Sequence, residues 1–465
     1  MQKPKVGLLG LTLEFYEAGG PELRKGREQF VRQRLVPALA EVADVRFDRA
    51  VYTREDVEKT VTRFEADQVD ILLVVLLTYS PSLISAPALK RTRLPIVIWN
   101  TQELYAVDES YSGKELSENH GVHGTHDLCN VLTRARVPFG YVTGHIQDAE
   151  TIPAVNELLR AGYGVSRLHR GRLGLIGYPF PGMGDFGCDL THVATTLGCA
   201  WEAISLSEYY HWVVQASRSD VSRLTDEYRN SYTLAPDVTD DDLAAAARAE
   251  VALRRLVYNY RLDAYSYQFL AFGEDARTET LPFVAASRLL GEGIGFGGEG
   301  DLISAAHAAL LGWLQPPASF SEMFTVDFAG NAVLLSHMGE ANVAMARSDR
   351  KIRLARSVKP IVPVRGNQLF LATVFQPGEA TLTALTLTAG QRWRIIASSI
   401  KLEGFGPAPL LAVPHTKVSP AGDVREFLTA YARAGGPHHL AVCFGDARRK
   451  LAQVCRYLDA DYVEI

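Results

Sequence analysis

The sequence predicts an α/β protein with doubly wound sheets in its first two thirds and a β-rich region near its C-terminus. Up to about residue 315, continuous apolar runs such as VDILLVVLL alternate with helical patterns, as expected for parallel strands covered on both faces. After Pro360 the chain has short β-rich segments with Gly and Pro turns, spaced like a small barrel or sandwich. At 465 residues it is too long for one core, so we expect several domains.

The N-terminal part reads as a series of strands and helices. A helix is expected over residues 21–42, with a kink or break at Pro37. The loops after the strands lie at the carboxyl edge of such a sheet, where ligands bind, and the loops at residues 13–16 and 100–113 are rich in polar and aromatic side chains. The predicted strands are KVGLLGLT, VDILLVVLL, PIVIWNT and VPFGYVTG.

A second α/β unit is expected from about Arg170. The strand GRLGLIG leads into a Pro/Gly-rich loop, YPFPGMGDFGCD, and WEAISLS is a further strand. Residues 239–270 are predicted to form one long helix with Thr239 as its N-cap. Glu299 falls on a glycine-rich elbow between two helices, LPFVAASRLLGEG and DLISAAHAALLGWL.

The C-terminal region is expected to be mainly β-structure, followed by a mixed tail. Helices are predicted at VREFLTAYARAGG and DARRKLAQVCRYLD, and strands at HHLAVCFG and DYVEI. The β-rich segments are LFLATVFQ, ATLTALTLT, QRWRIIASSIKLEG and PLLAVPHTKV.

Composition argues against several classes of protein. The net charge is -5 and no basic tract stands out, so we expect no nucleic-acid partner. The longest apolar stretch, residues 69–77, is too short to cross a bilayer, so we expect no membrane association. We also expect no signal peptide, and the five cysteines form no CxxC pair, which together favour the reducing cytoplasm.

Four polar, turn-flanked segments in the last third contain the residue types of a metal site. They are GFGGEGD with Glu299, ASFSEMFTVDF with Glu322, LLSHMGE with His337, and AGGPHHLAV with His438 and His439. Taken singly, each is more readily a solvated loop or a structural side chain. Two carboxylates and one or two imidazoles form a ligand set that suits a divalent ion such as Mn²⁺. Because alternate residues of a strand face opposite sides, at most one of the adjacent histidines should be a ligand.

A fifth polar segment is ENHGVHGTHDLCNVL. His120, His123 and His126 recur every third residue, which makes a zinc cluster conceivable. Helical ligand spacing is spoiled by the glycines between them, so a binding loop that opens a helix at about Asp127 is preferred. Its imidazoles could donate hydrogen bonds to sugar hydroxyls.

These segments resemble the L-arabinose isomerase group of the L-fucose/L-arabinose isomerase superfamily. GFGGEGD, SFSEMFTVDF, LSHMGE and GGPHH are similar to that family's four metal-binding segments, in the same order and with similar spacing. The resemblance assigns the metal to Glu299, Glu322, His337 and His439. It implies that the two glutamates also form the acid/base pair.

The resemblance also implies substrate contacts. HGVHG is similar to the family's histidine-bearing substrate loop, so His123 is the expected sugar contact, with His120 beside it. Glu14 and Tyr16 lie in the loop after the first strand, where the family has Gln-His-Leu-Tyr and this chain has Leu-Glu-Phe-Tyr. Phe180 lies in YPFPGMGD, where an Arg-containing pattern is usual, and is a further candidate contact.

The expected fold class is α/β, with two Rossmann-like doubly wound domains followed by a C-terminal domain that contains a β-barrel. The predicted domains span residues 1–168, 169–315 and 316–465. The resemblance implies a Mn²⁺ cofactor, with Co²⁺ or Mg²⁺ as other divalent candidates. It also implies a homo-oligomer, a trimer or hexamer, whose active sites lie between subunits.

The expected activity is metal-dependent aldose–ketose isomerisation of a neutral free sugar through an enediol intermediate. Two alternatives stay open at this point. Another Mn²⁺-dependent sugar enzyme, such as an aldolase or the isomerase of a different sugar, could use the same ligands. A non-catalytic sugar-binding protein is also possible, because open α/β folds include many binders.

Overall fold

The computed structural model describes residues 2–357, 367–404, 411 and 413–465, which fold into two compact units. Unit one comprises residues 1–167 and 452–458, and unit two comprises residues 168–451 and 459–465. The predicted division into three domains, with boundaries near residues 168 and 315, stays a prediction.

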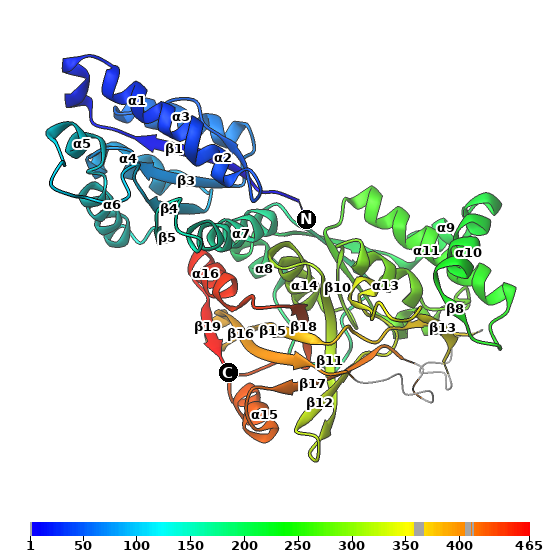
Figure 1. The fold of residues 1–465 in the computed structure, drawn as a ribbon. Helices are drawn as coiled ribbons and strands as arrows, with labels where there is room; N and C mark the ends of the chain where they lie inside the picture. Colours follow the sequence, from blue (N-terminus) through cyan, green and yellow to red (C-terminus); the bar gives the residue numbers. More distant parts are fainter. Residues whose placement is uncertain (1, 358–366, 405–410, 412) are drawn as a thin grey trace. The chain divides into compact units, whose positions relative to one another are not determined.

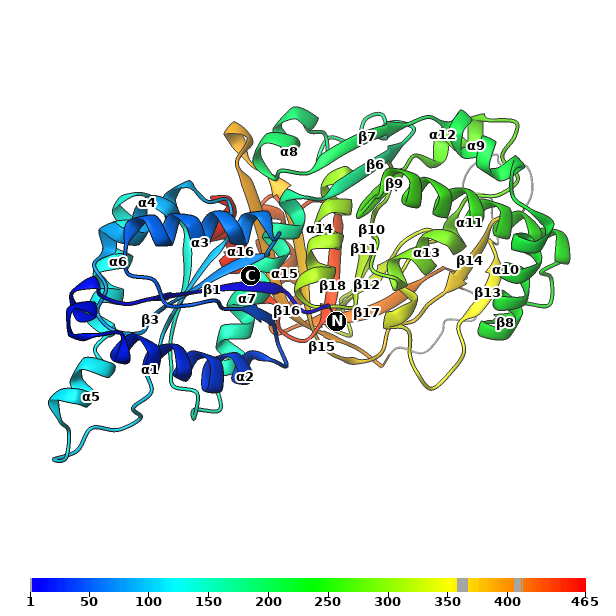
Figure 2. The same ribbon diagram turned by 90° about the horizontal axis from the view of Figure 1, so that it is seen from above.

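Unit one contains a five-stranded, all-parallel sheet with the strand order β2-β1-β3-β4-β5. Figure 2 shows α1 (Glu22–Phe30) and α2 (Val36–Leu39) on one side of the strands and α3 (Arg54–Ala66) on the other. The order reverses between β1 and β3, which is where ligands bind in sheets of this type. The strands are β1 (Lys5–Leu11), β2 (Asp44–Arg46), β3 (Ile71–Leu76), β4 (Ile96–Asn100) and β5 (Phe139–Thr143).

Pro37 interrupts its helix as predicted. Residues Val31–Leu35 form a π-helical turn (η2) between α1 and α2, because a proline cannot donate to the preceding turn and its ring crowds that turn. The remaining helical elements of this unit are η1 (Glu14–Gly19), α4 (Ser82–Arg91), α5 (Gly113–Glu118), α6 (Val122–Arg134) and α7 (Thr151–His169). The α16 helix (Arg448–Leu458) contributes its last residues.

Unit two begins with a four-stranded parallel sheet in the order β10-β9-β6-β7. Its strands are β6 (Arg172–Ile176), β7 (Ala200–Ile204), β9 (Ala264–Tyr267) and β10 (Gly295–Gly297). Its helices are α8 (Leu190–Thr196), α9 (Leu206–Val214), α10 (Arg218–Ser231), α11 (Asp240–Tyr260), α12 (Phe269–Glu274), α13 (Phe283–Gly291) and α14 (Leu302–Leu314).

The prediction of one helix over residues 239–270 is wrong at its C-terminal end. Thr239 is the N-cap, as expected, but α11 ends at Tyr260, and Arg261 adopts a left-handed conformation with φ of 53°. The next residues form β9, which is buried between β6 and β10.

Unit two also contains a closed β-barrel (Figure 1). Six antiparallel strands follow one another in the order β15-β18-β11-β12-β17-β16, and pairing between β15 and β16 closes the ring. The barrel strands are β11 (Ala318–Asp327), β12 (Ala332–Ser336), β15 (Gly378–Leu387), β16 (Trp393–Leu402), β17 (His415–Pro420) and β18 (His439–Phe444). Apolar side chains such as Leu382, Ile396 and Val442 form its core.

Several smaller elements complete unit two. Strand β19 (Asp461–Glu464) adds to β16 in parallel, and α15 (Val424–Arg433) forms the predicted tail helix. A small sheet joins β8 (Thr233–Leu234), β13 (Arg353–Arg356) and β14 (Leu369–Ala372), and short 3₁₀ turns lie at η3 (Val343–Met345) and η4 (Ala389–Gln391). Part of the predicted strand PLLAVPHTKV lies outside the described residues.

The predicted fold class is confirmed: parallel Rossmann-like sheets precede a barrel. Within the part of the chain that the structure describes, no helix combines the length and apolarity needed to cross a membrane.

Candidate metal centre

The four segments singled out in the sequence meet in unit two. Glu299 follows the carboxyl end of β10 and precedes α14, and Glu322 lies within barrel strand β11. In the barrel register Glu322 stands opposite Ser336 on one side and His439 on the other. Strand pairing therefore brings His439, and His337 directly after Ser336, to the same end of the barrel.

The candidate ligand atoms lie close together. His439 Nε2 is 3.4 Å from Glu299 Oε2 and 3.5 Å from Glu322 Oε1. His438 Nε2 is 3.6 Å from each of the same two oxygens. One ligand atom from each of these four residues lies within 4.8 Å of all the others. His337 Nε2 approaches from the Glu322 side, at 3.9 Å from Oε2.

The elbow that carries Glu299 is conformationally unusual. Glu299 has a φ of 61°, a left-handed conformation that is uncommon outside glycine and is often found at functional sites. Its carbonyl accepts a hydrogen bond from the backbone N–H of Phe180 at 2.8 Å. A Cβ on Gly298 would lie 2.9 Å from His337 Nε2, so the absence of a side chain leaves room for that imidazole. Phe180 thus supports the elbow through its backbone.

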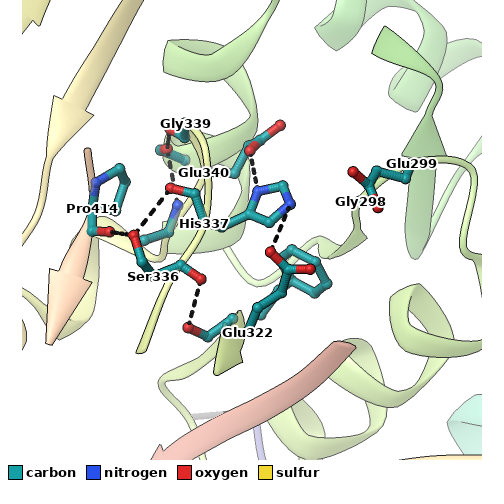
Figure 3. A network of polar contacts seen from close by, with 12 residues as sticks. Gly298, Glu299, Glu322, Ser336, His337, Gly339, Glu340 and Pro414 are labelled. Carbon is teal, nitrogen blue, oxygen red and sulfur yellow. Dashed lines mark hydrogen bonds and ion pairs between the residues drawn. The ribbon is translucent and has the colours of Figure 1, made fainter. Parts of the chain in front are cut away.

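Each imidazole is held at its Nδ1 atom by a carboxylate. An ionised carboxylate can only accept a hydrogen bond, so the imidazole Nδ1–H is the donor. Figure 3 shows His337 between Glu340 and Glu322. The Nδ1 distances are 2.5 Å from His337 to Glu340, 2.9 Å from His439 to Asp301 and 2.5 Å from His438 to Asp185. In each case Nε2 is left to face the glutamates.

Four polar atoms at this centre have no hydrogen-bond partner among the described residues. They are the Nε2 atoms of His337, His438 and His439 and one oxygen of Glu299. Buried polar atoms without partners are costly, and a group of them close together is what an ion site offers. Glu299, His438 and His439 belong with Glu322 to the close set of ligand atoms, and His337 is not part of that set. The donor set, two carboxylates with imidazole nitrogens, fits a divalent cation of the Mn²⁺ type.

Without a cation, the centre is a network of opposite charges. Burial alone would raise the pKa of Glu299, but the imidazoles of His438 and His439 outweigh it and lower the pKa to about 2. Burial alone would lower the pKa of His439, but Asp301 and Glu299 raise it to about 9. The proton on His439 therefore competes with any cation for Nε2.

The two adjacent histidines do not face opposite sides, so that part of the expectation is wrong. Their ring centroids are 4.0 Å apart, and both Nε2 atoms approach Glu299 and Glu322. The reason is that β18 begins at His439, so His438 lies before the strand and does not follow its alternation. The side chain of His438 is 34% exposed, whereas that of His439 is fully buried.

The remaining candidate residues belong to unit one. The Tyr16 hydroxyl and His120 Nε2 are hydrogen-bonded at 2.6 Å, and His123 stacks on Tyr79 with ring centroids 4.7 Å apart. Glu14 is exposed on η1. Tyr16, His120, His123 and Tyr79 form a polar and aromatic cluster within unit one.

The predicted loop before Asp127 is instead helical. The α6 helix begins at Val122 and includes Gly124. Glycine is favoured there because a Cβ on Gly124 would lie 2.8 Å from Leu76 Cδ2 and 3.1 Å from the backbone nitrogen of Ser80. Close packing against the end of β3 therefore outweighs the low helix propensity of glycine.

The sequence did not identify the three carboxylates that hold the imidazoles. Asp301 and Glu340 lie two and three positions after Glu299 and His337, so their proximity was a weak signal. Asp185 comes from the YPFPGMGDFGCD loop, and only the folded chain brings it to His438.

The regions of the chain that match known protein families contain the same four segments. The central domain of L-arabinose isomerase matches residues 184–314, and its C-terminal domain matches residues 317–461, together more than half of the chain. The chain belongs to the L-arabinose isomerase family. The resemblance to this family that the sequence motifs indicate is therefore confirmed.

Similar curated proteins are L-arabinose isomerases. That of Acidothermus cellulolyticus is 27% identical over 83% of this chain and 79% of its own length. That of Klebsiella pneumoniae is 28% identical over 79% of this chain and 75% of its own. That of Geobacillus kaustophilus is 24% identical over 87% and 83%. The prediction of an intramolecular oxidoreductase, an aldose–ketose isomerase, is confirmed by this membership.

A solved periplasmic solute-binding protein of Actinobacillus succinogenes with bound D-allose also shows a limited likeness. It is 15% identical over 67% of this chain and 92% of its own, with a TM-score of 0.16. A score this low has no bearing on the fold or on ligand binding.

Proposed function

We propose that the chain is a metal-dependent isomerase of a neutral free sugar that works through an enediol. The main support is the group of three imidazole nitrogens and one Glu299 oxygen without hydrogen-bond partners among the described residues, together with the close set of ligand atoms from Glu299, Glu322, His438 and His439. The proposed ligands are Glu299, Glu322, His337 and His439, with Mn²⁺ as the first choice and Co²⁺ or Mg²⁺ as alternatives.

A divalent ion here would supply Lewis-acid polarisation of the sugar carbonyl. The pKa of Glu299, lowered to about 2, keeps its carboxylate ionised at neutral pH, which a base requires. Of the two glutamates we assign Glu299 to take the proton from C2 of the open-chain aldose and to deliver it to C1. Glu322 is within reach of the same space and is assigned to move the hydroxyl proton from O2 to O1.

The acid/base assignment is tested by Glu299→Gln and Glu322→Gln. Each should lower kcat by about 10² to 10⁴, because an amide cannot exchange a proton with the sugar. Glu426→Gln, on the exposed surface of α15, is the matched control and should retain wild-type activity. In deuterated water the wild type should place deuterium at the carbon that receives the proton. Full activity of both site variants would refute the assignment.

The physiological sugar is best sought with a panel of pentoses, hexoses and deoxy sugars and the Mn²⁺-loaded protein. Product identification in that screen also separates an isomerase from an aldolase. Glu14 replaces a neutral amide, and a carboxylate accepts hydrogen bonds but cannot donate them. It would repel acidic sugars, so neutral sugars other than, or in addition to, L-arabinose are expected.

Glu14→Gln tests whether this side chain selects the substrate. We expect the ratios of kcat/KM across the panel to change, because an amide can donate a hydrogen bond where Glu14 cannot. An unchanged preference would show that Glu14 only faces solvent, where the structure exposes it.

We also propose a cytoplasmic trimer or hexamer in which the active site is completed by a neighbouring subunit, as the family resemblance implies. Light scattering coupled to size-exclusion chromatography measures the mass. A fully active monomer would contradict the proposed assembly.

A further inference from the structure

Asp301 connects a helix terminus to the candidate metal centre. It is the N-cap of α14, and its Oδ1 accepts from the backbone N–H of Ser304 at 2.9 Å. Its Oδ2 accepts from His439 Nδ1, also at 2.9 Å. Asp301 is 1% exposed and His439 is 1% exposed, so water is not available to replace either contact.

Both donors need an acceptor, and only a carboxylate has two acceptor oxygens at this position. The two donors lie on different oxygens of Asp301. A serine or an asparagine whose oxygen takes the Oδ1 position at Ser304 therefore leaves no acceptor at the Oδ2 position, where His439 Nδ1 donates. Without an acceptor at Nδ1, the His439 ring can turn or hold its proton on Nε2. Either change removes the nitrogen lone pair that faces Glu299 and Glu322.

We propose that Asp301 is a positioning residue of the metal centre, which fixes the tautomer and ring orientation of His439 while it caps α14. This inference rests on the proposed function in that it requires a cation at the centre. It assigns to Asp301 no contact with the sugar or the ion. The start of α14 and the geometry of the centre are thereby determined by the same carboxylate.

His337 has a similar arrangement on the other side of the centre. Glu340, 2% exposed, accepts from His337 Nδ1 through one oxygen and from the Tyr267 hydroxyl through the other. A tyrosine hydroxyl can turn to accept instead, so a glutamine at position 340 could satisfy both neighbours. The backbone N–H of Ser304 has no such freedom, and substitution of Asp301 should therefore have the larger effect.

The test is Mn²⁺ binding by metal-free Asp301→Ser, measured from the electron paramagnetic resonance signal of free Mn²⁺. Serine is as good an N-cap as aspartate, so the metal-free variant should fold and melt close to the wild type. Its Mn²⁺ affinity should fall about 10- to 100-fold, as for other outer-shell substitutions. Asp423→Ser is the matched control. Asp423 caps α15 through the N–H of Arg425 at 2.7 Å and has no imidazole partner among the described residues.

The outcomes separate the two proposals. If the wild type binds no Mn²⁺, the metal centre and the role of Asp301 both fail. If the wild type binds and folded Asp301→Ser binds equally well, only the positioning role fails. If serine prevents folding, Asp301→Asn, which keeps the size of the side chain, must show the same loss. Glu340→Gln should lose less affinity than either, and the reverse order would overturn the argument from acceptor number.

Discussion

At the scale of single residues, the centre is organised by carboxylates that accept a hydrogen bond from Nδ1 of each imidazole. This contact leaves Nε2 of each ring directed at Glu322, and Nε2 of His438 and His439 also at Glu299. The arrangement exists within the protein itself, so a cation would enter a site whose ligands are already oriented. The pairs are His337 with Glu340, His438 with Asp185 and His439 with Asp301.

Gly298→Ala should damage this centre without unfolding the protein. The new Cβ would lie 2.9 Å from His337 Nε2 and 3.1 Å from Phe320 Cζ, so the imidazole must move. We expect about tenfold weaker Mn²⁺ binding, as for other changes that displace a ligand imidazole. Calorimetric titration measures it, and Gly184→Ala is the control because a Cβ there meets nothing within 4 Å. Equal affinities in the two variants would contradict the proposed role of His337.

Metal affinity should increase with pH. Asp301 and Glu299 raise the pKa of His439 to about 9 despite burial, so the metal-free imidazole is protonated at neutral pH. A cation must displace that proton, and affinity should rise up to about tenfold per pH unit from pH ~6 to ~8. Without metal the sign for stability is opposite. The raised pKa stabilises the folded chain below about 6.5, and this contribution is lost as pH rises through about 9.

Titrations in buffers with different ionisation enthalpies will measure the protons released on binding. If the Mn²⁺ affinity does not change with pH and no proton is released, the cation does not displace a proton from His439.

Residue types and turn-flanked spacing were sufficient to single out four segments that the fold brings together. The outer carboxylates could not be predicted in the same way. Asp301 caps a helix and Glu340 lies in a loop between β12 and η3, which are ordinary positions for acidic residues. Their second contact, with an imidazole, depends on the path of the barrel strands, which local sequence does not determine.

At the scale of elements, one glycine controls how closely α6 approaches the first sheet. Gly124 lies in the first turn of α6 against Leu76 and Ser80, one position after His123. The close packing at Gly124 therefore also fixes where His123 lies beside Tyr79.

Gly124→Ala should destabilise unit one by about 1–3 kcal/mol, because the added methyl group overpacks a contact that has no space. Chemical denaturation measures the free energy of unfolding. Gly113→Ala is the control: it lies at the start of α5, where a Cβ meets nothing within 4 Å, and it should be neutral or slightly stabilising. A variant at Gly124 as stable as the control would refute the packing argument.

Most helices and strands follow from the sequence pattern, but short buried segments do not. The sequence pattern extends the helix through residues 264–267, because so short a segment has no diagnostic period of its own. The structure makes them β9, since the left-handed Arg261 ends α11 and both neighbouring strands supply backbone partners. Pro37 is the opposite case, because its effect on the preceding turn is local and could be predicted.

At the scale of the whole molecule, the candidate centre in unit two joins two kinds of sheet. The parallel sheet supplies Glu299 at the carboxyl end of β10, and the barrel supplies Glu322, His337 and His439. The fold class could be predicted because apolar runs and turn spacing are local features. The order of the strands in the barrel could not, because it pairs strands far apart in sequence, such as β11 with β18.

The central claim is that Glu299, Glu322, His337 and His439 hold one divalent ion in a sugar isomerase. Its most direct test is a Mn²⁺ titration of the metal-free wild type and of single alanine variants at these positions, with His438→Ala for comparison. We expect one ion per chain in the wild type, sharply weakened binding in each of the four variants, and retained binding in His438→Ala. The account would be contradicted by a wild type without saturable binding, or by loss of binding in His438→Ala but not in His439→Ala.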